Sequence, residues 1–226
     1  EQARLRPHAI AIRQTDFGIW NPVDWQTWWR RARHVGHGLR ALGLPAGGHV
    51  GVLSENRVEW VLAQLGSSLV GAITVGVYPT SPAPEVAYVL AHADVDVVVC
   101  EDQEQTDKVI AARAQLPRLR AIVVMEKKGL RNTPPGHRDL VRSFDELEQL
   151  GAQHEAAHPG LVEAVLAAQT LDDIALPDGA AEFQTRVQWW LQSREWYAAR
   201  GIPWRTSARS VRAVRKMKGM RAHSGW

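Results

Sequence analysis

The chain has 226 residues, 45% of them hydrophobic, and a formal net charge of +3, which allows one large or two small domains with a sizeable core. Its single cysteine, Cys100, excludes an internal disulfide, and no apolar run reaches the roughly 18 residues of a membrane-spanning helix. The charged amino terminus is not a signal peptide and lacks an initiator methionine, so we expect a cytoplasmic segment cut from something longer.

The charge is divided unevenly along the chain. Residues 177–226 hold 10 Lys and Arg against 3 Asp and Glu, whereas residues 1–176 hold 17 against 21. Five of the ten tryptophans also lie in the last 50 residues. We therefore expect two parts, an α/β region over residues 1–176 and a divergent basic tail over residues 177–226.

The first predicted element is a helix over residues 24–43. Apolar side chains, several of them tryptophans that we expect to pack, recur there at helical spacing. Asp24 can cap its start and Gly43 can end it. We expect His34 and His37, on the same helix, to be partly exposed packing residues rather than metal ligands.

Strands and helices then alternate. Asn56 and Glu59 have the spacing of a capping box, and Ser81 followed by Pro82 can begin a later helix. Each crossover is long enough for parallel pairing, so the pattern predicts an open, mainly parallel α/β sheet with helices on both faces. The predicted strands are 50–53, 72–80, 94–102 and 120–126, and the helices between them are 56–71, 81–93 and 103–117.

The third of these strands is a nearly continuous apolar run, which is typical of a strand covered on both faces. Cys100 lies near its end, and we expect it to be an inert core thiol. After the fourth strand the order weakens: a polar loop over 127–139 precedes short helices over 143–151 and 158–170.

The sequence His154-Glu155-x-x-His158 matches the zinc-protease pattern, which needs both histidines on one face of a continuing helix. Pro159 follows directly and disfavours helical angles at His158, so we expect the helix to be ending there. Neither Glu163 nor His137 has a spacing required of a third ligand. We therefore predict no zinc site.

Other chemical motifs are missing from the sequence. It contains neither G-x-x-x-x-G-K-[ST] nor G-x-G-x-x-G after a strand, and it has no G-x-S-x-G elbow and no convincing carboxylate pair. From the residues alone we predict an α/β domain with no catalytic, cofactor-binding or metal residue of its own.

Three stretches of the sequence nevertheless resemble those of a known family: "SENRVEW" from Ser54, "VGVYPTSP" from Val75, and the run from "YVLAHAD" to "VVVCED". Together with their spacing over residues 6–176, they closely resemble the N-terminal region of the long-chain acyl-CoA synthetases, AMP-forming ligases of the adenylate-forming superfamily. The family's usual Gly-Asp-Arg-Val is replaced by Gly48-His49-Val50.

The resemblance implies a reaction in which ATP and a fatty acid form an acyl-adenylate and pyrophosphate, after which coenzyme A takes the acyl group. It also implies a Ser/Thr/Gly-rich phosphate loop ending in Pro-Lys-Gly after residues 172–176, where this chain reads "PDGAAEFQTRVQWW". The family's adenine- and magnesium-binding motifs and its C-terminal domain with the adenylation lysine are also absent. No catalytic residue of the family carries over, and no ATP, Mg²⁺ or coenzyme A site is expected in this chain.

Residues 177–226 leave three readings open. They can be a frame-shifted reading of a GC-rich gene, a basic amphipathic module, or a structural cap over the truncated sheet. Phe183, Val187 and Trp190 lie on one side of a possible first helix, and "SARSVRAVRKMKGMRA" can form a second. The leading expectation is an inactive ligase fragment. The alternative is a binding module for an anionic membrane surface, with nucleic acid the less expected partner.

Overall fold

The computed structural model of the chain describes residues 1–16, 18–128, 133 and 135–169. They belong to one compact unit, Glu1–Gln169, and the predictions for residues 177–226 and for the boundary at residue 176 lie outside them. The elements in chain order are α1 (Gln2–Leu5), β1 (Ile10–Asp16), β2 (Ile19–Asp24), α2 (Trp25–Ala41), β3 (His49–Leu53), α3 (Val58–Leu69), β4 (Ile73–Val77), α4 (Ala83–His92), β5 (Val97–Cys100), α5 (Gln103–Ala111), η1 (Arg113–Gln115), β6 (Ala121–Val124), η3 (Pro135–Leu140), β7 (Val141–Ser143), α6 (Phe144–Ala157) and α7 (Leu161–Ala168).

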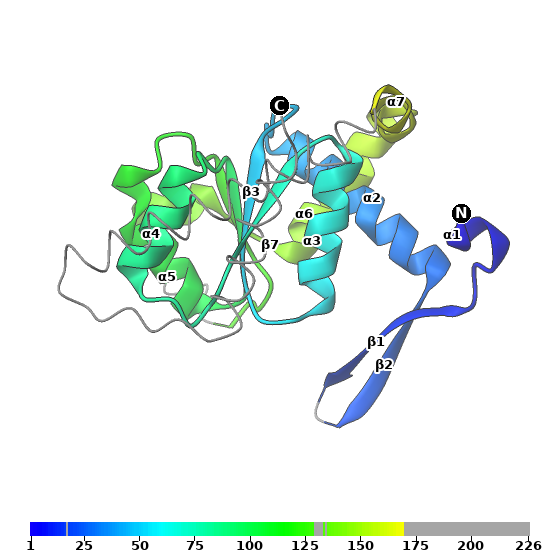
Figure 1. Cartoon of the computed structure of the whole chain (residues 1–226), viewed down its shortest axis with the longest axis horizontal. Coiled ribbons are helices and arrows are strands. Elements are labelled where there is room, and N and C mark those ends of the chain that lie inside the picture. The colour runs from blue at the N-terminus through cyan, green and yellow to red at the C-terminus, as the bar shows by residue number, and fades with distance from the viewer. Residues whose placement is uncertain (17, 129–132, 134, 170–226) are drawn as a thin grey trace, which may run out of the picture. The chain divides into compact units, whose positions relative to one another are not determined.

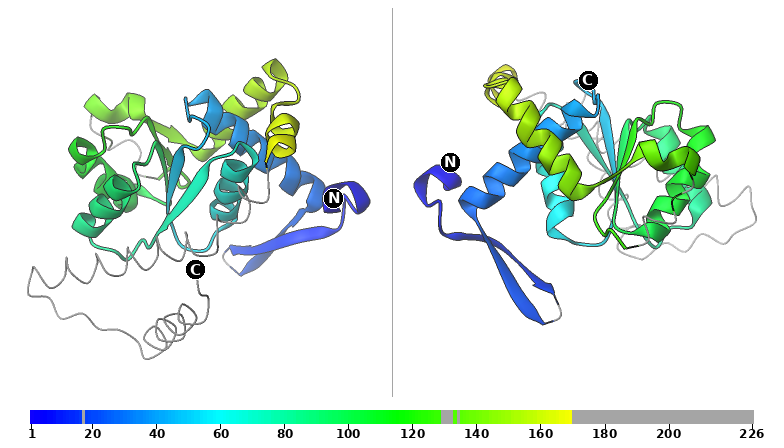
Figure 2. Two further views of the ribbon diagram at one scale, coloured as in Figure 1. Left: turned by 45° about the horizontal axis from the view of Figure 1, so that its top comes forward. Right: turned by 180° about the vertical axis from the view of Figure 1, so that it is seen from behind.

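The centre of this unit is a five-stranded sheet in the order β4-β3-β5-β6-β7, with every neighbouring pair parallel. Helices α4 and α5 cover one face, and α2, α3 and α6 lie on the other (Figures 1 and 2). Parallel strands need such covered crossovers, because each must return to the same edge before the next strand begins. The predicted parallel α/β sheet with helices on both faces is confirmed.

The core runs through the middle of the sheet. Every residue of β5 and β6 is buried, as expected for strands covered on both faces. Cys100 is fully buried at the end of β5, and this burial raises the pKa of its thiol. The predicted core position of Cys100 is therefore confirmed, and its inertness stays a prediction that the raised pKa supports.

Glycines let the helices on the α2 face approach closely. A Cβ added to Gly36 on α2 would lie 2.7 Å from the carbonyl oxygen of Gly66 on α3. Across α2 and α6, a Cβ at Gly151 would lie 1.7 Å from the carbonyl oxygen of His34. Since real Cβ atoms do not approach so closely, these contacts require glycine and place the backbones against each other.

Two β elements were not predicted from the sequence. Strands β1 and β2 pair antiparallel from Ile10 to Asp24 as a hairpin that projects beside the start of α2 (Figure 1). Strand β7, which adds a fifth strand beside β6, is only three residues long. Short strands that contain Arg and Pro carry little apolar periodicity, so the sequence pattern gave no signal for them.

The helix ends are partly as predicted. Oδ1 of Asp24 accepts the backbone N–H of Thr27 at 2.7 Å, which confirms Asp24 as the cap of α2. The predicted capping box at Asn56 is wrong, because the N-cap of α3 is Arg57 and its side chain makes no cap bond. The predicted Ser81 cap is also wrong: Pro82 is the N-cap of α4, which begins at Ala83.

Helix α6 is longer than the sequence predicted. Its capping box joins Ser143 to Glu146, but the helix continues past residue 151 to Ala157. Polar contacts with α2, rather than an apolar stripe, accompany this last part, which is why the hydrophobic pattern missed it. The helix ends with His158 as C-cap, as predicted from Pro159.

Candidate functional site

The strand order singles out one edge of the sheet. From β3 the chain passes to β4 on one side, and later strands continue from β5 on the other, so the order reverses at the β3–β5 junction. In open α/β sheets, ligands bind in the crevice outside the carboxyl ends of the strands at such a point. This edge is therefore the place to look for a site.

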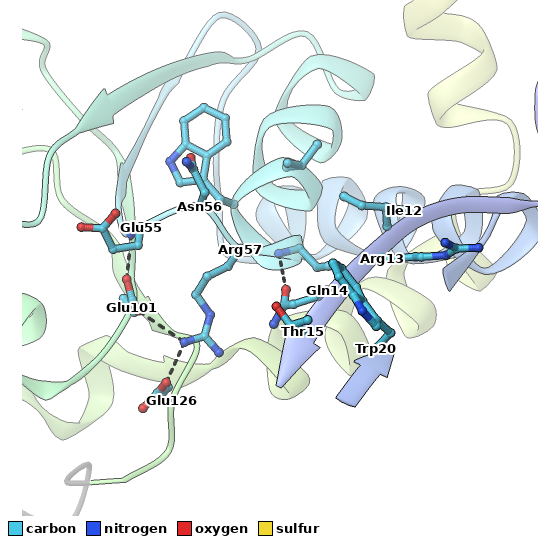
Figure 3. A pocket seen from close by; sticks show the side chains of 13 residues that line it. Ile12, Arg13, Gln14, Thr15, Trp20, Glu55, Asn56, Arg57, Glu101 and Glu126 are labelled. Carbon is cyan, nitrogen blue, oxygen red and sulfur yellow. Dashed lines mark hydrogen bonds and ion pairs between the residues drawn. The ribbon is translucent and has the colours of Figure 1, made fainter. Parts of the chain in front are cut away.

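A cavity of about 610 Å³ opens at this place, between the carboxyl edge and the β1–β2 hairpin. Its lining residues come from the two hairpin strands, the β3–α3 connection, the first turn of α3, and the residues after β5 and β6 (Figure 3). They are Ile12, Arg13, Gln14, Thr15, Trp20, Glu55, Asn56, Arg57, Val58, Trp60, Val61, Glu101 and Glu126.

Arg57 joins three segments at the carboxyl edge. Its Nη1 lies 2.6 Å from Oε1 of Glu126 and 3.4 Å from Oε1 of Glu101 (Figure 3). Its Nε lies 3.5 Å from a carboxylate oxygen of Glu59. Burial of the guanidinium opposes its charge, but these carboxylates outweigh that effect and raise the pKa of Arg57. The arginine is thus a fixed cation that ties α3 to the ends of β5 and β6.

Glu101 completes this network from the end of β5. Its Oε2 accepts the backbone N–H of Glu55 at 2.7 Å and the hydroxyl of Ser54 at 3.2 Å. The carboxylate therefore holds the β3–α3 connection by two bonds while its other oxygen meets Arg57. Both oxygens are engaged, so Glu101 supports the loop rather than offering a free base.

The hairpin forms the opposite wall and caps α3. Oε1 of Gln14 accepts the backbone N–H of Val58, the first residue of α3, at 2.8 Å (Figure 3). This bond satisfies one of the helix's amino-terminal donors from 44 positions earlier in the chain, in place of the predicted Asn56 cap. Arg13 points away from the network, and Trp20 remains 64% exposed.

The polar residues that line the cavity hold several chain segments together. Arg57 is paired with carboxylates, and the described residues that line the cavity include no serine, cysteine or histidine. In the described part of the chain, no three His, Cys, Asp or Glu side chains gather closely enough to hold a metal ion.

The charged residues of this edge were missed in the sequence. Glu101 directly follows β5, and Glu126 stands two residues after β6. Charged residues just after buried strands are a usable signal, because parallel strands bring their carboxyl ends to one edge. No comparable sequence signal identified Arg57, because its ion pairs depend on Glu101 and Glu126 lying close together in the folded chain.

The residues of the zinc-protease pattern lie on α6 and at its end, and its glutamate forms an ion pair. On α6, Glu155 pairs with Arg33 at 2.6 Å, and Arg33 also pairs with Glu163 of α7, one of the considered third ligands. His137, the other, lies in η3. Glu155, which holds the position of the general base in the pattern, and Glu163, a considered third ligand, are thus both paired with Arg33.

Of the two histidines of α2, His34 agrees with the prediction and His37 does not. His34 is partly exposed, as expected, with its Nε2 3.5 Å from Glu155. His37 was also expected to be partly exposed, but it is completely buried and its Nδ1 lies 3.0 Å from Nδ1 of His154. The close α2–α6 approach buries a face of α2 that its local pattern left ambiguous.

At the opposite edge of the sheet, Asp96 is a completely buried carboxylate just before β5. It accepts the backbone N–H of His49 at 3.1 Å and lies 3.2 Å from Nη2 of Arg118. These partners compensate its burial and tie the amino ends of β3 and β5 together.

Among the described helices, none has both the length and the apolar character needed to cross a bilayer.

Comparisons with known proteins agree with this architecture. The model of the AMP-binding enzyme family matches residues 1–176. The long-chain-fatty-acid–CoA ligase ACSBG2 of Xenopus laevis is 32% identical over 115 residues, which are 51% of this chain and 15% of that ligase. The ligase ACSBG1 of Rattus norvegicus is 30% identical over 135 residues, 59% of this chain and 18% of that protein.

The chain thus spans less than a fifth of the length of these ligases. Among solved structures, acetoacetyl-CoA synthetase from Streptomyces lividans is similar, with a TM-score of 0.57 and 25% identity over 65% of this chain and 23% of that protein. The chain therefore belongs to the AMP-binding enzyme family, and its matched part corresponds to the N-terminal region of an adenylate-forming acyl-CoA synthetase.

Proposed function

We propose that residues 1–176 are the N-terminal scaffold of a long-chain fatty-acid–CoA ligase. The observation that carries this proposal is the family match over these residues, combined with the similarity to long-chain-fatty-acid–CoA ligases. In such a ligase, ATP and a fatty acid would form an acyl-adenylate, and coenzyme A would then accept the acyl group. Fatty acid, ATP, Mg²⁺ and coenzyme A are accordingly the substrates and cofactors of the longer enzyme.

The 226-residue chain by itself is proposed to be inactive. Its described cavity lining holds a paired arginine and no serine, cysteine or histidine, and the sequence after residue 176 has no Ser/Thr/Gly-rich loop ending in Pro-Lys-Gly. Backbone amides and hydroxyls of such a loop can hold a triphosphate, so a chain without it lacks a means of positioning ATP. The scaffold would supply shape and stability rather than reacting groups.

An ATP–pyrophosphate exchange assay with a long-chain fatty acid tests this proposal. The purified chain should give no more exchange than a heat-denatured sample, while a complete long-chain fatty-acid–CoA ligase run alongside should exchange readily. Fatty-acid-dependent exchange well above the denatured sample would contradict inactivity.

The frame-shift reading of residues 177–226 has its own test in the gene. If one of the other two frames after codon 176 encodes a Ser/Thr/Gly-rich loop with Pro-Lys-Gly, the tail is a shifted reading of a complete ligase. If neither frame encodes such a loop, the frame-shift origin is excluded, and the tail is a basic module or a structural cap.

A second candidate function is a surface-binding module in residues 177–226. The observation that favours it is the balance of 10 basic against 3 acidic residues, interleaved with tryptophans. Arginine is attracted to anionic headgroups and indole prefers the membrane interface, and each basic residue near an anionic surface contributes about 1 kcal/mol. The predicted result is peripheral contact that weakens with salt.

Co-sedimentation with vesicles distinguishes the two functions. The whole chain should bind phosphatidylserine-containing vesicles at low salt, and a variant with Arg209, Arg212, Arg215 and Lys216 changed to Gln should bind much less. Neutral vesicles and single-stranded DNA serve as comparisons. Equal binding by both chains, or none by either, would leave the scaffold role alone.

A further inference from the structure

A pair of histidines lies inside the α2–α6 contact, away from the cavity. His37 of α2 is completely buried, and its Nδ1 lies 3.0 Å from Nδ1 of His154 of α6. The Nε2 of His37 is buried, and none of the residues that the structure describes gives it a hydrogen-bond partner. The ring of His154 also stacks on that of His158, with centroids 4.1 Å apart.

The distance between the two Nδ1 atoms restricts the protonation of the pair. A hydrogen bond at 3.0 Å needs one nitrogen to carry a proton and the other to present a lone pair. Because Nε2 of His37 has no acceptor, a proton is better placed on its Nδ1, leaving His154 as the acceptor. Both rings are then neutral, and either added proton disturbs the arrangement.

A proton added to His37 would create a buried N–H at Nε2 with nothing to receive it. A proton added to Nδ1 of His154 would face the N–H of His37 at hydrogen-bond distance. The close approach of Gly38 and Gly151 leaves α2 and α6 no space to shift within the contact. The interface therefore accommodates the neutral pair and opposes the charged one.

The surrounding charges act in both directions. A further positive charge on the histidine pair is disfavoured by Arg33 and Arg40 of α2 and by His158, the C-cap of α6. It is favoured by Glu155 of α6 and Glu163 of α7. His34 also lies near, 3.5 Å from Glu155. Burial outweighs the two carboxylates and lowers the pKa of His37, and burial followed by His158 lowers the pKa of His154.

We propose that His37 and His154 form a pH-sensitive contact that holds α6 on α2 at neutral pH and releases the carboxyl-terminal half of α6 on mild acidification. Arg33 connects the same region to Glu155 and to Glu163 of α7, so α7 would loosen with it. The groups that respond are the imidazoles, and the element that moves is the segment from Gly151 to Ala168.

The direction follows from proton linkage. Both histidines have a lower pKa in the folded chain than the ordinary histidine pKa of 6.5, which holds in the unfolded chain. The unfolded state therefore takes up more protons as the pH falls. Stability from the pair is complete above this value and is lost as the pH falls below it. Between pH 7.5 and 5.5 each histidine can raise the unfolding equilibrium constant by up to about tenfold.

Imidazole ¹⁵N NMR of the full chain tests the pair directly and needs no variant. At pH 7.5 we expect a protonated Nδ1 on one of the two rings and a bare Nδ1 on the other, with a bare Nε2 on His37. Bare Nδ1 atoms on both rings, or a charged ring at this pH, would overturn the proposal.

Urea unfolding and hydrogen exchange between pH 7.5 and 5.5 test the consequence. The wild-type unfolding constant should rise more than that of His154→Gln, by up to about tenfold, and exchange should accelerate first in residues 151–157. His92→Gln, which changes an exposed histidine on α4, should keep the wild-type response. Equal pH responses of the wild type and His154→Gln, or uniform acceleration along the chain, would refute the switch.

Discussion

The α2–α6 contact and the carboxyl edge of the sheet hold the same domain together by different means. Across α2 and α6 the backbones meet, and a Cβ at Gly38 would lie 2.2 Å from the carbonyl oxygen of Leu147. At the carboxyl edge, long side chains meet around Arg57 beside a cavity of about 610 Å³. The first region has no space to adjust, whereas the second is closed by groups that can rotate.

This difference explains which region resists change. An added atom between two backbones cannot be relieved by rotating a side chain, so helices must separate. An ion pair at a partly exposed edge can be replaced by water at modest cost. We therefore expect substitutions at the α2–α6 contact to cost more free energy than those around Arg57.

The largest effect is expected for Gly151→Ala. Its Cβ would lie 1.7 Å from the carbonyl oxygen of His34, so the variant should lose about 3 kcal/mol or more of unfolding free energy. Urea denaturation of the full chain measures this loss. Gly136→Ala, at a glycine with nothing near its Cβ position, should change stability by less than about 0.5 kcal/mol. Similar values for both variants would contradict the backbone contact.

Arg57→Ala should have an intermediate effect. It leaves Glu101 and Glu126 without their shared cation, and we expect a loss of about 1–2 kcal/mol, below the cost at a fully buried pair because these groups are partly exposed. Arg13→Ala, an exposed arginine lining the same cavity, is the matched control and should cost less than about 0.5 kcal/mol. A loss larger than that of Gly151→Ala would reverse the comparison.

Gln14→Ala should lower the free energy of unfolding by a smaller amount again, about 1 kcal/mol, because it removes the acceptor for the backbone N–H of Val58. The change should also speed hydrogen exchange at the first turn of α3 without affecting α6. Thr15→Ala, at the next and exposed position of the same strand, should leave that exchange unchanged. Unaltered exchange in Gln14→Ala would mean that the hairpin does not cap α3.

The smallest effect concerns the start of α6, where side chains again make the contact. The backbone N–H of Ser143, bonded to Glu146, lowers the pKa of that carboxyl below 4.5, so its stabilisation is present above this value and is lost as the pH falls. The stability difference between wild type and Glu146→Gln should therefore shrink between pH 6 and pH 3. A constant difference over that range would argue against the capping box.

Much of the fold could be predicted from local patterns. A nearly continuous apolar run marked β5, helical spacing marked α2, and Asp24 marked the start of α2, because burial on two faces or on one stripe leaves a pattern in the sequence. Pro159 likewise indicated the end of α6. The family resemblance rested on longer stretches and was confirmed by the match over residues 1–176.

The candidate site depended on tertiary structure. Gln14 caps α3 from 44 positions away, and His37 meets His154 across 117 positions. Neither pair leaves a local repeat, since each partner reads by itself as an ordinary polar residue on a strand or helix. The sequence by itself determined the strands β3 to β6 and the helices between them, through burial that leaves an apolar pattern. Only the packed structure decided which polar groups meet, because hydrogen bonds and ion pairs depend on distances that the fold creates.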